Sequence, residues 1–330
     1  MKVCRWILVR GATAVVLTLG IAQGIAQAQT APDEIPAIAV EATPERARYS
    51  LLETIALSIF NKRAPKREWT PLYADTFFSE GWFEPHIGPP PGTGGSVRQG
   101  WIGVPEAFFN RQIVGIYSQK HGVNGGTNET IGGTILESPM NRRYDFGVLV
   151  PFADSISDKA GQQNTGVGDT LFFNRFLVHE TADLSVSFNC NVLAPTGSRA
   201  YGNQRTSVIP YVAFYKDLQR GFSFRGAGGA DVPVDDRPDG RTSSIFGSLA
   251  AGQTLTPHDT PIVGDFTYYL CANIVQDFGT GNNHNAQLSL TPGIRTHLGR
   301  NWFFLAGIAV PVTGLKQYDE RYTFVLVKGF

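Results

Sequence analysis

Charged side chains recur on alternate positions of several long apolar segments, and they are the first candidates for a functional role. Eight residues have this placement: Arg143, Asp145, Arg225, Asp231, Asp265, Asp277, Arg295 and His297. Because both signs of charge occur, a lumen lined by these residues would lack the uniform ring of charge that selects one class of ion. We expect them to line an interior as hydrogen-bonded pairs.

Residue patterns that carry catalysis are weak in this chain. His284 has no recognisable serine or acidic partner for a lipid-hydrolysing triad. The six histidines show no metal-ligand spacing. The glycine-rich run 226–230 is not followed by a helix, as a nucleotide site requires. We predict no catalytic residue, no metal and no cofactor, and an outer-membrane hydrolase that uses His284 is the least favoured alternative.

Composition excludes two broad classes of protein. Lys+Arg and Asp+Glu both number 28, whereas nucleic-acid binding needs a basic face that neutralises phosphates. Charged residues make up 17% of the chain and aromatic residues 12%, the opposite of the composition of disordered proteins. We therefore expect a folded chain with a large apolar surface and no nucleic-acid partner.

Residues 1–28 have the layout of a Sec signal peptide. Basic residues precede an apolar stretch, and Ala26-Gln27-Ala28 supplies the small side chains that a signal peptidase reads. The stretch is shorter than the ~20 residues that a membrane-spanning helix needs. No later segment reaches about 18 consecutive apolar residues. The exported protein is therefore either soluble outside the inner membrane or a transmembrane β-barrel.

Side chains of alternating polarity mark the longest segments. From Asp183 to Pro195, apolar residues occupy one parity, while Asp, Ser and Asn occupy the other. Successive side chains of a strand point to opposite faces, so the pattern predicts one apolar and one polar face. Similar patterns recur at 262–276 and 284–298.

The length of these segments separates a membrane barrel from a soluble sandwich, whose strands also alternate. Ordinary strands have about five or six residues, and a tilted membrane strand needs about 9–11. Long polar loops and short turns also alternate along the chain, as in outer-membrane barrels. We predict an all-β, antiparallel, up-and-down transmembrane β-barrel of about 12 strands, with ten or fourteen as alternatives. The predicted strands are 107–119, 129–138, 142–152, 167–179, 183–195, 206–216, 222–233, 244–255, 262–276, 284–298, 302–312 and 321–330.

Aromatic residues gather where these strands end. Amphipathic rings favour the boundary between membrane and water, and the predicted interface residues are Tyr144, Phe152, Phe222, Trp302 and Tyr322. The two cysteines beyond the signal peptide have opposite parities, because Cys190 follows the lipid-facing set and Cys271 the lumen-facing set. We predict that no disulfide joins them.

Residues 29–106 differ from the barrel region 107–330. The segment from Pro44 to Asn61 has apolar residues at helical spacing, and an aromatic and proline-rich stretch follows. We expect a partly helical or irregular segment, which is either a periplasmic tail that packs against the barrel mouth or a plug inserted into the lumen. The tail is the favoured alternative.

The last residues carry a resemblance. Residues 322–330 end in Phe330 with apolar side chains on alternate positions before it, and they resemble the C-terminal strand of Gram-negative outer-membrane proteins. The resemblance implies recognition by the barrel-assembly machinery and location in the bacterial outer membrane. Lys328 departs from the pattern, since an apolar residue is usual there, but a lysine near the interface can extend its amine to water.

A narrower resemblance covers residues 160–330. The runs Gly166-Val-Gly-Asp169, Leu184-Ser-Val-Ser-Phe188 and Leu193-Ala-Pro-Thr-Gly197 are similar to those of the MetA-pathway phenol-degradation family of outer-membrane proteins. A transport role is attributed to that family, which implies small organic solutes.

The expected function is therefore an outer-membrane channel or transporter for passive passage of small organic solutes, aromatic or apolar ones included. Its expected partners are outer-membrane lipid, the assembly machinery and the solute. The alternative is a closed barrel whose long outer loops bind a surface partner.

Overall fold

The computed structural model describes residues 49–60, 68–123, 127–157, 163–198, 205–235, 243–278, 286–313 and 316–330. Contacts divide the chain into Met1–Ala47 and Arg48–Phe330, and all described residues belong to the second unit. The predicted signal peptide (1–28) and His284 lie outside the described residues.

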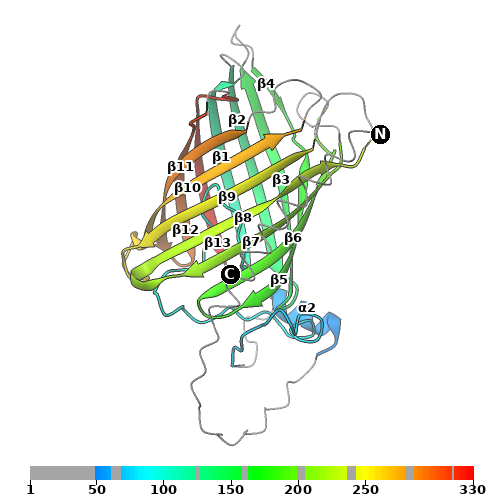
Figure 1. Cartoon of the computed structure of the whole chain (residues 1–330), viewed down its shortest axis with the longest axis vertical. Helices are drawn as coiled ribbons and strands as arrows, with labels where there is room; N and C mark the ends of the chain where they lie inside the picture. The colour runs from blue at the N-terminus through cyan, green and yellow to red at the C-terminus, as the bar shows by residue number, and fades with distance from the viewer. Residues whose placement is uncertain are drawn as a thin grey trace, which may run out of the picture. The chain divides into compact units, whose positions relative to one another are not determined.

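The described unit is a closed, antiparallel β-barrel (Figure 1). Its strands are β1 Gln112–Val123, β2 Thr127–Pro139, β3 Tyr144–Ser157, β4 Gln163–Gly166, β5 Thr170–Glu180, β6 Leu184–Ala194, β7 Ser207–Asp217, β8 Phe222–Pro233, β9 Ser244–Thr254, β10 Gly264–Asp277, β11 Gln287–Gly299, β12 Trp302–Pro311 and β13 Glu320–Gly329. Neighbours in sequence pair with each other, and β1 pairs with β13 to close the sheet. Because β4 and β5 both pair with β3, the barrel has twelve strand positions. The predicted fold class is confirmed.

Three predicted boundaries are wrong. The first strand begins at Gln112 and not at 107, because Ala107, Phe108 and Phe109 are buried outside the sheet. The third predicted strand, 142–152, is too short, since β3 continues to Ser157 and pairs there with β4. The fourth predicted strand, 167–179, starts too early, because residues 167–169 separate β4 from β5, which begins at Thr170.

The two faces of the sheet reverse the pattern of a soluble protein. In β6, Phe188 is 43% exposed on the outside, whereas Asn189 is 0% exposed on the inside. Ser185 and Ser187 are also buried. Apolar side chains on the outside of a closed barrel suit contact with lipid, and polar side chains on the inside suit a lumen.

Four of the five predicted interface aromatics, Tyr144, Phe222, Trp302 and Tyr322, lie at or near strand ends. Phe222 and Trp302 are exposed, and Tyr144 and Tyr322 are half-buried. Phe152 lies within β3. At the C-terminal strand, the Lys328 amine donates to the Arg300 carbonyl at 2.5 Å and lies over the rings of Trp302 and Phe330.

The predicted helix within 44–61 is α2 (Leu51–Phe60). Ser50 and Glu53 form a capping box at its start: the Ser50 amide donates to the Glu53 carboxylate at 3.0 Å, and the Glu53 amide donates to Ser50 Oγ at 3.3 Å. Among the described residues, no helix combines the length and apolar character needed to cross a membrane.

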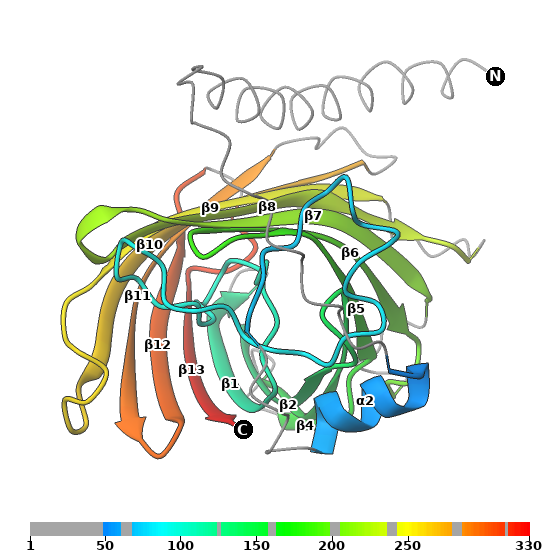
Figure 2. The same ribbon diagram turned by 90° about the horizontal axis from the view of Figure 1, so that it is seen from below.

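The residues just before β1 enter the barrel (Figure 2). Trp101, Ile102 and Val104 form one core cluster with residues of β1, β9, β10, β12 and β13. Phe108 forms a second cluster with residues of β7. We call residues 93–109 the plug. The mouth is the end of the barrel that carries the short turns 140–143, 181–183, 218–221, 255–263 and 300–301.

These contacts correct the favoured expectation for the segment before the barrel. Residues 69–86 cover the mouth, as a tail would, and Leu72 pairs with Glu180 in a short bridge. Residues 96–109, however, have the contacts of an inserted plug. The sequence did not separate the two because an aromatic segment packs equally well in either place.

Candidate functional site

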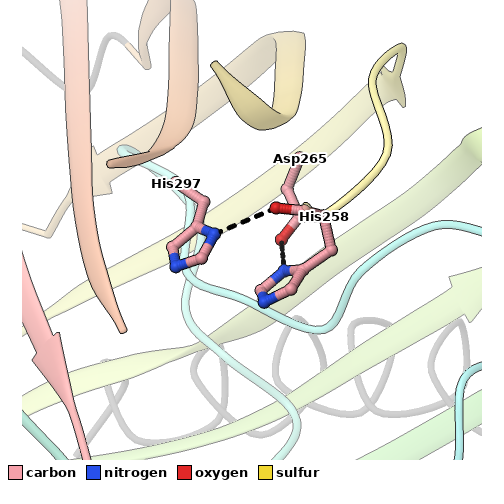
Figure 3. Close-up of side chains that lie close together, drawn as sticks. All are labelled: His258, Asp265 and His297. Carbon is pink, nitrogen blue, oxygen red and sulfur yellow. Dashed lines mark hydrogen bonds and ion pairs between the residues drawn. The ribbon is translucent and has the colours of Figure 1, made fainter. Parts of the chain in front are cut away.

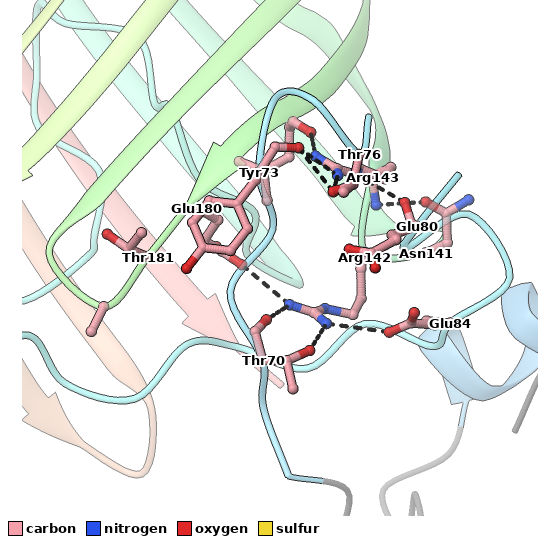
Figure 4. A network of polar contacts seen from close by, with 12 residues as sticks. Thr70, Tyr73, Thr76, Glu80, Glu84, Asn141, Arg142, Arg143, Glu180 and Thr181 are labelled. Atoms are coloured by element: carbon pink, nitrogen blue, oxygen red, sulfur yellow. Dashed lines mark hydrogen bonds and ion pairs between the residues drawn. The ribbon is translucent and has the colours of Figure 1, made fainter. Parts of the chain in front are cut away.

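Two neighbouring arginines at the β2–β3 turn hold residues 69–86, which we call the covering segment, to the mouth (Figure 4). Arg142 donates to Thr70 and forms an ion pair with Glu84 at 3.2 Å. Arg143 donates to the backbone carbonyls of Glu80 and Tyr73, each at 2.9 Å. Arg143 also donates to the carbonyls at 177 and 178 on β5. One guanidinium therefore joins the covering segment to the sheet, and burial makes the loss of any of these bonds costly.

Two aspartates at short turns hold the start of the plug. Asp183 accepts the Thr93 amide at 2.7 Å. Asp217 accepts the amides of Gly94 and Ser96 at 3.0 and 3.2 Å. Carboxylates that accept backbone N–H groups form strong, charge-assisted hydrogen bonds. The entry of the plug is thus fixed to the β5–β6 and β7–β8 turns.

Arg225 of β8 is the main contact between the barrel wall and the plug. Its guanidinium lies 3.7 Å from the centre of the Trp101 ring. It donates to the carbonyl of Val97 at 3.0 Å and to the carbonyl of Gln99. Since Arg225 is buried, its stacking on Trp101 and its two hydrogen bonds replace the water that the charge loses.

Glycines in the wall make room for the Trp101 side chain. The Trp101 and Tyr269 rings are parallel, with centroids 4.8 Å apart, and the Tyr269 hydroxyl accepts the Ile102 amide at 2.9 Å. Gly252 and Gly293 flank Tyr269 on the neighbouring strands. A Cβ on Gly293 would lie 2.4 Å from the Tyr269 ring, and one on Gly252 would lie 2.7 Å from Trp101. Only glycine fits beside this stack.

On another side of the lumen, one guanidinium meets three carboxylates. Arg175 of β5 forms ion pairs with Asp145 at 2.6 Å, with Glu106 of the plug at 3.7 Å and with Glu137 of β2. The wall residues Arg175, Asp145 and Glu137 are nearly or fully buried. Buried charges are retained where they are paired, so Glu106 joins the plug to a network that the wall already forms.

Beside the plug lies a cavity of about 760 Å³. At the mouth it is lined by residues such as Asn301 and Gly329, and inside the barrel by apolar side chains of β1, β2, β12 and β13. The apolar residues are Val114, Ile116, Ile135, Leu305, Val325 and Val327. The charged residues of the lining are Arg98, Glu106, Arg111, Glu137 and Arg295. A mostly apolar cavity of this size with a few polar groups is typical of a small-molecule site.

The structure separates the predicted lumen residues into three groups. Buried side chains belong to Arg143, Asp145, Arg225, Asp265, Arg295 and His297. Asp231 is half-buried, and Asp277 is exposed at the end of β10. Arg143 contacts the covering segment, Arg225 the plug and Asp145 the acidic network, so these residues do not form one site.

Several residues of the site have no counterpart among the sequence candidates. Trp101 and Glu106 fall in the segment predicted to be a tail. Arg175 and Glu137 fall in the predicted strands 167–179 and 129–138, in which polar and apolar side chains do not alternate regularly. The available signal was the cluster of aromatic residues and charges just before β1.

Cys190 and Cys271 are free thiols, and the Cys271 thiol donates to the Gly103 carbonyl at 3.2 Å.

A histidine in the covering segment predicts a pH effect. Burial, together with the charges of Arg142 and Arg111, lowers the pKa of His86 to about 3 from 6.5. Below pH 6.5, His86 binds a proton when the segment is undocked but stays neutral when it is docked. Docking is therefore strongest above pH 6.5 and weakens as the pH falls toward 3. We expect hydrogen exchange in residues 80–90, corrected for intrinsic rates, to accelerate in this range.

The variant His86→Gln is the control for this effect, because it keeps a polar side chain that does not titrate. Its exchange profile is expected to be flatter between pH 7 and pH 4. Equal pH profiles in the two proteins would show that other groups control docking.

The architecture defines the class of protein: a closed barrel with a lipid-compatible outer face, a polar lumen and an inserted plug. Residues 115–315 match the family model described as the MetA-pathway of phenol degradation, which covers more than half of the chain. The chain belongs to this family. The family and the barrel place it in the bacterial outer membrane.

One solved structure shares the fold, and two further porins are similar at lower TM-scores. An outer-membrane channel from Pseudomonas putida F1 is 14% identical, with a TM-score of 0.55 over 70% of this chain and 99% of that chain. The NanC porin is 11% identical, with a TM-score of 0.45 over 66% of this chain and 98% of that chain. The KdgM porin, solved with oligogalacturonate, is 10% identical, with a TM-score of 0.43 over 66% and 99%. A comparison with curated proteins gives no match.

Proposed function

We propose that this chain is an outer-membrane channel that passes small organic solutes passively, with aromatic and apolar molecules preferred. The observation that carries the proposal is the cavity of about 760 Å³ that runs from the mouth into the lumen beside the plug. The family and the fold of the Pseudomonas putida F1 channel support the same function.

The lining of the cavity supports the preference for organic solutes. Val114, Ile116 and Ile135 lie beside Leu305, Val325 and Val327 on four neighbouring strands, and together they form one apolar wall of the cavity. Such a surface replaces water around an aromatic ring at little cost, whereas a sugar would lose hydrogen bonds to water. Arg295 at the same cavity adds a cation that suits a solute with a carboxylate.

The features of the mouth indicate which side of the membrane this end of the barrel faces. Short turns and the C-terminal end of β13 lie there, and this is the periplasmic side of barrels whose chain ends are both periplasmic. We propose that residues 68–109 face the periplasm and that the assembly machinery reads the strand ending in Phe330.

One pair of substitutions tests the cavity. Val325 is 9% exposed on the lumen face, and Leu326, the next residue, is 45% exposed on the outer face. We expect Val325→Trp to fill the cavity and reduce benzoate flux into proteoliposomes several-fold, while Leu326→Trp leaves the flux unchanged. The matched position on the opposite face controls for the bulk of the new side chain.

Two further measurements complete the test. Sucrose flux should be low in all three proteins, and heat-modifiable migration on a denaturing gel should show that each barrel is folded. Wild-type protein that passes neither benzoate nor sucrose would favour a closed barrel. Equal benzoate flux in the two tryptophan variants would show that the cavity is not the route.

A further inference from the structure

Two histidines and one aspartate meet at the mouth (Figure 3). His258 lies in the β9–β10 turn, Asp265 at the start of β10 and His297 near the end of β11. One ligand atom from each residue lies within 4.8 Å of the other two. The three residues are too far apart in sequence to form a recognisable motif, which explains why the sequence predicted no metal.

Strand pairing brings the group together. Gly264 is opposite His297, and the register between β10 and β11 shifts between Gly264 and Thr267. The backbone of Asp265 has a φ of 47°, in the left-handed region that non-glycine residues rarely adopt. Irregularities of this kind redirect side chains at strand ends. Here the Asp265 side chain is buried beside the His258 ring.

His297 has one nitrogen bonded and one nitrogen free. Its Nδ1 lies 3.2 Å from the His258 carbonyl, so this nitrogen carries the proton and donates. That leaves Nε2 with a lone pair. This Nε2 atom is buried and has no hydrogen-bond partner among the described residues, and the whole residue is only 7% exposed. Metal-binding histidines commonly donate their second nitrogen to a backbone carbonyl in this way.

The other two side chains supply the remaining ligands. Asp265 Oδ2 lies 2.6 Å from His258 Nδ1. The His258 side chain is 54% exposed and stacks on His297 with ring centroids 4.2 Å apart. One nitrogen of this exposed ring already lies within 4.8 Å of a ligand atom of each of the other two residues. The exposed side also gives the ion a route from solvent and room for a water ligand.

We propose that His258, Asp265 and His297 bind a divalent transition-metal ion such as Zn²⁺, which fastens the β9–β10 turn to β11. Two imidazoles and one carboxylate, with one open position, are a common ligand set for zinc. Imidazole nitrogen disfavours Mg²⁺ and Ca²⁺, which prefer oxygen ligands.

The test uses the full chain, folded in detergent and treated with a chelator. Titration calorimetry with ZnCl₂ is expected to show one bound ion per chain, and Zn²⁺ is expected to raise the unfolding temperature on heat-modifiable gels. MgCl₂ at the same concentration should do neither. Absence of Zn²⁺ binding, or an equal shift with Mg²⁺, would overturn the proposal.

Three variants locate the site. His258→Ala removes an exposed side chain, so its barrel is expected to fold, and it should lose the Zn²⁺-dependent rise in unfolding temperature. His297→Ala should behave in the same way where it folds. His121→Ala, a histidine of β1 outside the group, is the matched control and should keep the response. Zn²⁺ binding of wild-type strength in His258→Ala would show that the ion binds elsewhere.

Discussion

Replacement of residues 96–109 with a Gly/Ser chain of equal length is expected to raise the single-channel conductance of the barrel several-fold. The replacement removes the Trp101 and Phe108 side chains and Glu106, which attach the plug to the wall. A Gly/Ser chain behaves as a flexible coil and makes no such contacts. The lumen then opens beyond the existing cavity, and conductance in planar bilayers measures the gain.

The same variant must remain a barrel for the comparison to be valid. Its strands and their pairing do not include residues 96–109, so heat-modifiable migration is expected to persist. Folded variant protein with wild-type conductance would show that the plug does not limit passage. Loss of heat-modifiable migration would instead show that the plug is part of the folding core.

Arg225→Met is expected to release the plug from the wall. The substitution removes the stacking on Trp101 and leaves the carbonyls of Val97 and Gln99 without their donor. From typical energies of such contacts, docking should weaken by about 3 kcal/mol, which is roughly a hundredfold in the undocked population. Trypsin cleavage at Arg98 and Arg111 should accelerate accordingly.

Two further variants define the cause. Arg225→Lys keeps the charge but not the planar group that stacks and donates twice, so its cleavage rate should fall between those of the wild type and Arg225→Met. Lys316→Ala changes an exposed basic residue between β12 and β13, at the end of the barrel opposite the mouth, and should cleave like the wild type. Wild-type cleavage in Arg225→Met would refute the role of this residue.

The barrel could be predicted because lipid and lumen impose opposite polarities on neighbouring side chains. In β6, Phe188 and Asn189 show this directly, and most strand limits follow from the same alternation. The pattern fails where apolar residues face the interior. Phe108 packs against Tyr215 and lies 5.5 Å from the Arg225 guanidinium. Its apolar run therefore looked like a strand in the sequence.

The functional contacts were less predictable because strand pairing decides them. Arg175 meets Glu137 from another strand and Glu106 from the plug, and no spacing in sequence relates these residues. His258, Asp265 and His297 depend on the register of β10 and β11 in the same way. Alternation gives the face of a residue but not its partner.

The plug enters and leaves through one opening. Its first residues bind Asp183 and Asp217 in the turns of the mouth. Just after its end, the backbone carbonyl of Arg111 accepts the Phe330 amide at the same rim. A loop with both ends at one rim withdraws as a hairpin, so no chain end has to thread through the cylinder. The plug can therefore leave and re-enter the barrel while every pair of neighbouring strands stays hydrogen-bonded.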